Sequence, residues 1–176
     1  MANHFSQLAK KSRTNGSSEK IVKEQTGKPS LDIYKLGDDV LRQNSKRITK
    51  VDESIRKLAR EMLQSMYAAK GIGLAAPQIG INKELLVIDV NFEDSAAEPL
   101  ILINPEITDF GTTLNSYEEG CLSIPGVYLN VVRPSTIKLK FRDEMGRPRK
   151  MKADGLLARC IPVSYTHLTL PTNREV

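Results

Sequence analysis

The chain has 176 residues, of which 40% are apolar and 27% are charged, the composition of one globular domain of ordinary size. It contains no run of about 18 apolar residues and no apolar segment near Met1, so the sequence predicts neither a membrane span nor a secretory signal. Two cysteines are too few for a disulfide framework. We therefore expect a reducing compartment, the cytoplasm, with import into an organelle as the alternative.

The net charge of +5 lies mostly in residues 1–30, which contribute +4 of it. Because this charge belongs to one end of the chain and not to the whole body, we do not expect a DNA-binding protein. The segment predicts a flexible basic leader. Simple solvation is the ordinary role of such a leader, and a weak contact with an acidic partner such as the ribosome is the alternative.

The first predicted element of the folded part is an amphipathic helix after Asp52, which is a suitable N-cap. Gly71 follows it as a suitable stop. The apolar residues between them recur at three- and four-residue spacing, which places them on one buried face, the methionines included: Ile55, Leu58, Met62, Met66 and Ala69.

Strand-like segments occupy the middle of the chain. In residues 136–142 apolar and basic side chains alternate, and a turn at Asp143 leads into a returning strand. A final helix is predicted over residues 155–161. Strands flanked by helices predict an α+β fold with mainly antiparallel sheets, one long helix on the N-terminal side and a truncated C-terminal helix. The strand-like segments are residues 84–90, 99–107, 127–132, 136–142 and 147–153.

Residues 71–78 (Gly-Ile-Gly-Leu-Ala-Ala-Pro-Gln) form the first unusual stretch. They follow a helix and lack Lys-Ser/Thr, so a phosphate-binding loop is a poor interpretation. The small residues would let another segment of backbone approach closely. Gln78 offers an amide that can donate to an oxygen, although a helix end followed by a surface glutamine is the alternative.

Residues 117–126 (Tyr-Glu-Glu-Gly-Cys-Leu-Ser-Ile-Pro-Gly) form the second unusual stretch. Cys121 follows Gly120 on a predicted loop that leads into a strand. A cysteine placed in this way is suited to bind a metal or to act as a nucleophile, whereas an inert cysteine beside a turn is the alternative.

Together the two stretches resemble the first two signature motifs of the peptide deformylases. The similarity continues through Asn104-Pro105-Glu106, through Arg142-Asp143-x-x-Gly146 and through residues 153–158. It covers about residues 31–161, which we take as the domain. The resemblance implies sheets around an active-site cleft and a hydrolase that removes the formyl group from the N-terminal methionine of nascent polypeptides.

The resemblance also implies a metal site. In the family one Cys and two His hold a divalent metal, iron(II) with zinc(II) as the alternative, and a water takes the fourth position. Cys121 corresponds to the Cys ligand. The side chain of Gln78 and the backbone N–H of Leu122 correspond to the donors that stabilise the developing oxyanion.

Substrate binding is implied in the same way. Ile72 and Gly73 correspond to the segment that pairs with the peptide backbone like an added strand. Glu119 and Gly120 are the further substrate-binding candidates. The implied partners are formylmethionyl nascent peptides, with the ribosome as a further partner through residues 1–30; DNA and membrane partners are not implied.

The third family motif, Gln-His-Glu-x-x-His, should fall at positions 162–167, where the chain departs from it. His167 takes the place of the second His ligand, whereas Val163 replaces the first and Ser164 replaces the Glu. Pro162 would cost about 3 kcal/mol inside a helix. We interpret residues 162–176 as sequence foreign to the domain, from a truncated reading frame or read-through into unrelated DNA. A genuine, divergent C-terminus is the alternative.

The sequence therefore predicts a deformylase by family whose metal retention is poor and whose hydrolysis is negligible. One alternative is a non-catalytic scaffold that binds nascent chains or the ribosome. The other is a metal-free hydrolase that uses Cys121 with His167, and it is the less favoured because Glu118 and Glu119 would oppose thiolate formation.

Overall fold

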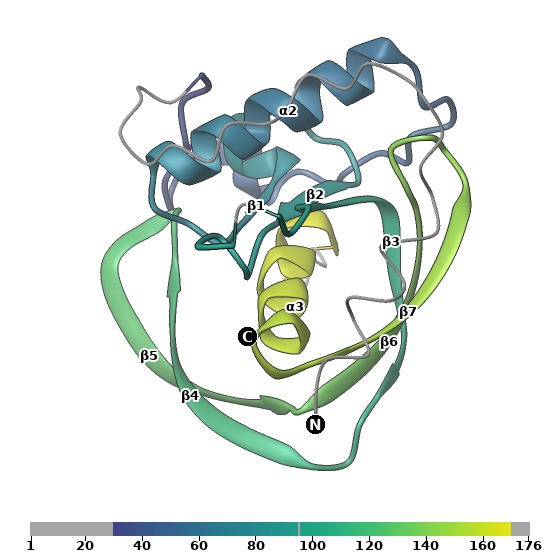
Figure 1. Cartoon of the computed structure of the whole chain (residues 1–176). Coiled ribbons are helices and arrows are strands. Elements are labelled where there is room, and N and C mark those ends of the chain that lie inside the picture. The colour runs from purple at the N-terminus through teal and green to yellow at the C-terminus, as the bar shows by residue number, and fades with distance from the viewer. Residues whose placement is uncertain (1–29, 95, 170–176) are drawn as a thin grey trace.

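The computed structural model describes residues 30–94 and 96–169 (Figure 1). All pairs of its named strands are antiparallel, which confirms the predicted α+β fold. The predicted leader lies outside the described residues except for Ser30. None of the described helices combines the length and the apolar character needed to cross a membrane. The elements are η2 (Asp39–Arg42), α2 (Glu53–Ala68), β1 (Gly73–Ala75), η3 (Ala76–Ile79), β2 (Leu85–Ile88), β3 (Leu100–Phe110), β4 (Leu114–Cys121), β5 (Ile124–Pro134), β6 (Thr136–Arg142), β7 (Pro148–Asp154) and α3 (Gly155–Thr169).

The larger sheet has five strands in the order β1-β2-β3-β6-β7. Four of them match predicted segments to within three residues at each end. The turn between β6 and β7 is also as predicted, since the N–H of Asp143 donates to the carbonyl of Arg147 at 3.0 Å. The edge strand β1 was not predicted, because three residues are too few to show a period of two.

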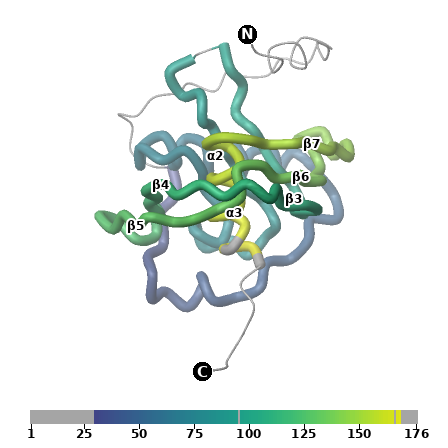
Figure 2. Tube along the Cα trace, turned by 90° about the horizontal axis from the view of Figure 1, so that it is seen from below, coloured from purple at the N-terminus to yellow at the C-terminus, as the bar shows by residue number. Residues whose placement is uncertain are grey.

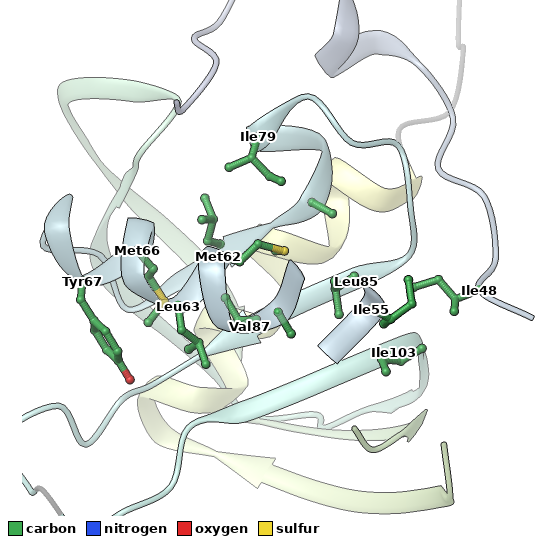
Figure 3. Close-up of a cluster of buried hydrophobic side chains, with 13 residues drawn as sticks. Ile48, Ile55, Met62, Leu63, Met66, Tyr67, Ile79, Leu85, Val87 and Ile103 are labelled. Atoms are coloured by element: carbon green, nitrogen blue, oxygen red, sulfur yellow. The ribbon is translucent and has the colours of Figure 1, made fainter. Parts of the chain in front are cut away.

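Helix α2 covers one face of this sheet. The Asp52 carboxylate caps it by accepting the N–H of Ile55 at 3.2 Å, as predicted. Met62 and Met66 are fully buried against the sheet, which confirms them as core residues (Figure 3). The helix ends slightly earlier than predicted, and Lys70 rather than Gly71 adopts the left-handed conformation, with φ 57°.

Helix α3 packs against the other face of the sheet, where Leu157, Ala158 and Ile161 join its second buried cluster. The prediction that this helix ends at Ile161 is wrong, because it continues to Thr169 with Pro162 inside it. A proline removes one backbone donor and distorts one turn. The burial of Leu157, Ile161 and Leu168 against the sheet offsets that cost, since packing supplies most of the stability of a helix in a protein.

Strands β4 and β5 form a separate two-stranded sheet, which we call the β4–β5 ribbon. In Figure 1 α3 lies between this ribbon and strands β6 and β7, and in the perpendicular view of Figure 2 the ribbon crosses in front of α3. Cys121 is the last residue of β4 and not part of a loop, which corrects the prediction; the turn begins at Leu122. Residues 114–120 are largely exposed, so they carry no burial pattern that would have indicated a strand.

Candidate functional site

A cleft of about 750 Å³ lies where the β4–β5 ribbon, β1 and α3 meet. Its walls come from segments far apart in the sequence. They include every residue that the sequence singled out as a site candidate: Ile72, Gly73, Gln78, Glu119, Gly120, Cys121, Leu122 and His167.

The chemically reactive pair in the cleft is Cys121 and His167. The Cys121 Sγ and His167 Nε2 atoms lie 3.5 Å apart. Burial lowers the pKa of His167. The imidazole is therefore biased toward its neutral form, which can bind a metal or accept a proton.

Gln78 is only 3% exposed, so the alternative of a surface glutamine is wrong. Its Oε1 accepts the N–H of Ala75 at 2.9 Å, and its Nε2 donates to the Ser123 Oγ at 3.1 Å. The same Nε2 lies 3.7 Å from the Cys121 Sγ. These bonds fix the amide with its donor nitrogen directed toward the sulfur.

Gly71, before β1, and Gly73, the first residue of β1, permit close packing around the cleft. A Cβ on Gly71 would lie 2.6 Å from the Leu122 Cδ1, and a Cβ on Gly73 would lie 2.5 Å from the Cys160 Sγ. The prediction that these small residues let another segment of backbone approach is corrected in one respect, although a close approach does occur. The groups that approach are side chains and not another backbone.

The α3 wall of the cleft carries Val163, Ser164 and His167, with Cys160 one turn before Ser164. Burial raises the pKa of the Cys160 thiol to about 12, and a hydrogen bond with Ser164 offsets this only in part. The thiol donates to the Ile72 carbonyl at 3.7 Å. Cys160 is therefore an inert packing residue between α3 and β1.

The Glu119 carboxylate, predicted to bind substrate, is occupied by two arginines. The Arg133 Nε lies 3.0 Å from both of its oxygens, and the Arg159 Nη2 lies 2.8 Å from Oε1. Any substrate contact at this residue would therefore have to use its backbone. Sequence reasoning missed both arginines, although a carboxylate so close to a cleft cysteine was a signal that a cation should be near.

Lys35 is a further cleft residue that the sequence did not single out. Its Nζ donates to the carbonyl of Leu122 at 3.0 Å, directly after the candidate cysteine. The N–H of Leu36 also donates to the Ser123 carbonyl at 2.8 Å. The extended segment at the start of the domain thus holds the turn that follows β4.

The residues present do not fit a three-ligand metal site. A thiolate and an imidazole bound to one tetrahedral ion lie about 3.6 Å apart, which the Cys121–His167 pair matches. The third position, one helical turn before His167, is Val163, whose side chain has no donor atom. Within residues 30–94 and 96–169 no group of three His, Cys, Asp or Glu side chains could hold an ion.

Comparison with known proteins identifies the family. The model of the polypeptide deformylase family matches residues 30–169. The chain belongs to this family. A peptide deformylase of Prochlorococcus marinus strain AS9601 is 94% identical to it over 168 residues, which cover 96% of this chain and 84% of the relative. Peptide deformylase 2 of strain MIT 9313 is 61% identical, with the same two coverages.

Solved structures agree with this assignment. A peptide deformylase from Synechococcus elongatus in complex with actinonin matches with a TM-score of 0.83 and 53% identity, covering 86% of this chain and 82% of that one. The peptide deformylase from Thermotoga maritima matches with a TM-score of 0.73 and 36% identity, covering 78% and 90%. The predicted family is therefore confirmed.

Polypeptide deformylases are metal-dependent hydrolases of protein biosynthesis, and they act on formylated nascent peptides. By family the chain is an enzyme. The α3 wall of the cleft carries Val163 and Ser164, which supply neither a third ligand nor a carboxylate.

Proposed function

We propose that this chain binds the formylmethionyl end of nascent peptides in the cleft but hydrolyses the formyl amide at a negligible rate. The observation that supports this is the pair Val163 and Ser164, which line the cleft where the family motif has His and Glu. Loss of the proton-transferring carboxylate alone should cost about 10²–10⁴-fold in rate. Loss of a ligand should leave the divalent metal, iron(II) with zinc(II) as the alternative, weakly held.

Substrate binding would use the parts of the cleft that are intact. Strand β1 is at the edge of its sheet and pairs only with β2, so its other edge can accept an extended peptide next to Ile72 and Gly73. Gln78 and the backbone N–H of Leu122 are the proposed donors to the formyl oxygen. The backbone of Gly120 adds a contact on the opposite wall.

The test compares this chain with a variant that restores the motif, Pro162→Gln, Val163→His and Ser164→Glu. Both proteins are loaded with iron(II) without oxygen and desalted, and then bound metal and formate release from a formylmethionyl tripeptide are measured. We expect about one metal per chain in the restored variant only, and formate release at least about 10²-fold faster. A matched control adds Cys121→Ala to the restored variant and should lose both gains.

Equal metal content and equal formate release in the two proteins would overturn the proposal. Formate release from the original chain that persists after metal removal and stops on Cys121 alkylation would instead favour the metal-free hydrolase, for which the 3.5 Å Cys121–His167 separation is suitable.

The second candidate function is a non-catalytic scaffold, because the cleft and its donors remain although the ligand set does not. It predicts saturable binding of the formylmethionyl tripeptide by the original chain without turnover, measured by calorimetry. Contact with the ribosome through residues 1–30, in the cytoplasm, belongs to this candidate. Deleting residues 1–29 should then weaken ribosome cosedimentation and leave tripeptide binding unchanged.

The division of the chain is part of the proposal. We take residues 31–161 as the deformylase domain and residues 162–176 as foreign sequence, because positions 162–166 differ from the family motif. An independent read of the source gene beyond the codon for Ile161 tests this. A read that encodes Gln-His-Glu-x-x-His makes the natural protein an ordinary deformylase. A read that encodes Pro162 and the residues after it makes the chain a divergent, non-hydrolytic member.

A further inference from the structure

The turn of the β4–β5 ribbon at residues 122–123 is held by Lys35, Leu36 and Gln78, whereas along its two strands the ribbon is attached to the rest of the domain by few interactions. Its two strands pair with each other and with no strand of the larger sheet. A two-stranded ribbon alone is only marginally stable in water. Burial does not hold it in place either, because several of its large apolar side chains are exposed: Leu114, Tyr117, Val127, Tyr128, Leu129 and Val132.

Arg159 connects α3 to both strands of the ribbon. Its Nη1 donates to the Asn115 carbonyl at 3.0 Å, and its Nη2 donates to the Val131 carbonyl at 2.6 Å and to the Glu119 carboxylate at 2.8 Å. The guanidinium also lies 4.7 Å from the centre of the Tyr117 ring. One side chain thus contacts the ribbon at four places.

Burying an arginine between α3 and the ribbon carries a desolvation cost that an apolar side chain would not. The Arg159 side chain is only 7% exposed, and its Nε is buried without a partner among the described residues. A buried ion pair often adds no more stability than apolar residues of similar volume, and its best-attested role is to fix one arrangement of the elements it joins. An apolar residue would fill the same space between α3 and the ribbon but would not fix the ribbon.

Arg133 binds the same carboxylate as Arg159 but does not connect the ribbon to α3. It is itself a ribbon residue on β5, and its two bonds to Glu119 link β5 to β4. It therefore adds nothing to the attachment between the ribbon and α3. The two arginines share one partner and differ in what they connect.

We propose that Arg159 is a positioning residue that holds the β4–β5 ribbon against α3 and thereby sets the separation of Cys121, at the end of β4, from His167, on α3. Its effect on Cys121 passes through Glu119 and the backbone of β4. The inference concerns the shape of the cleft, so it does not depend on whether the chain hydrolyses peptides.

The two free cysteines of the chain report on the two sides of this contact. Cys121 is half-buried at the end of the ribbon, whereas Cys160 is buried in α3. The experiment measures alkylation of each cysteine by mass spectrometry in the full-length chain and in the variants Arg159→Met, Arg159→Lys and Arg133→Met. Methionine keeps an apolar stem of similar length and removes every donor.

We expect Arg159→Met to raise the alkylation rate of Cys121 about tenfold, because the ribbon then opens locally, and to leave Cys160 protected. Arg159→Lys should restore part of the protection, and Arg133→Met should change the Cys121 rate less than about twofold. An equal effect of Arg133→Met would overturn the proposal. So would a parallel rise at Cys160, which would show general loosening of the fold, or an unchanged Cys121 rate.

Discussion

The five-stranded sheet and the β4–β5 ribbon differ in what stabilises them. The sheet is covered on one face by α2 and on the other by α3, and its strand β2 and the first half of β3 are almost completely buried. The ribbon is exposed along most of its length and is held by polar contacts, those of Arg159 along its strands and those of Lys35, Leu36 and Gln78 at its turn. Stability therefore resides in the sheet, whereas the candidate chemistry depends on where the ribbon meets α3. Changes in one region should leave the other largely intact.

The largest effect is expected in the sheet. Leu63 lies on α2, is fully buried and belongs to the cluster between that helix and the sheet (Figure 3). Leu63→Ala should lower the free energy of unfolding by about 2–5 kcal/mol, through lost burial and the cavity left behind. Urea denaturation monitored by circular dichroism measures this loss of stability.

Below the unfolding transition, the ratio of Cys121 to Cys160 alkylation in Leu63→Ala should stay within about twofold of the original, because Leu63 lies on α2, outside the contact between α3 and the ribbon. A selective rise at Cys121 would contradict the separation of the two regions, since it would show that the core beneath α2 also positions the ribbon.

An intermediate effect is expected at the boundary, where Cys160 packs α3 against β1. Burial raises the pKa of its thiol from 9.0 to about 12. The neutral thiol is thus favoured in the folded state, so its contribution to stability is complete below pH 9 and is lost as the pH rises toward 12. Between pH 9 and 10.5 this should remove roughly 1–2 kcal/mol of the free energy of unfolding.

Cys160→Ala is the matched variant for this prediction. It should lose some stability at pH 8 but show a smaller further loss on going to pH 10.5, measured by urea denaturation at each pH. Identical losses in the two proteins would mean that ionisation of Cys160 does not contribute and that other groups cause the alkaline destabilisation.

The sequence predicted the sheet far better than the ribbon, and the difference has a physical cause. Residues 136–142 alternate because one face of β6 is buried, and α2 shows a helical period because one of its faces is buried. β4 has no buried face, so its sequence carries no such pattern, and Cys121 was assigned to a loop. The predicted end of α3 was wrong for the opposite reason. Packing against the sheet stabilises the helix beyond Pro162, although proline itself disfavours a helix at that position.

The candidate site shows the same limit. The two motif stretches identified Gln78 and Cys121, and the structure places Cys121 beside both Gln78 and His167. The two arginines that bind Glu119, Arg133 and Arg159, were not identified, because their contacts depend on how β4, β5 and α3 come together, which no local pattern records. A buried carboxylate indicates that a cation is needed, but it does not indicate which one.

The smallest effect is expected in the ribbon, and one substitution made in both regions tests the comparison directly. Val132 on β5 is 61% exposed, whereas Val87 on β2 is 0% exposed. Val→Thr keeps the β-branched shape and adds a hydroxyl. Val132→Thr should change the free energy of unfolding by less than about 0.5 kcal/mol, because water continues to solvate that hydroxyl. Val87→Thr should lower it by about 1–3 kcal/mol, because the hydroxyl is buried among apolar residues.

Urea denaturation at two protein concentrations measures both variants. A loss at Val132 as large as that at Val87, and present at both concentrations, would show that the ribbon is buried in the folded chain and would remove the contrast between the two regions. A loss that appears only at the higher concentration would locate the burial between molecules, and the ribbon would then be exposed in the single chain and covered by a second copy.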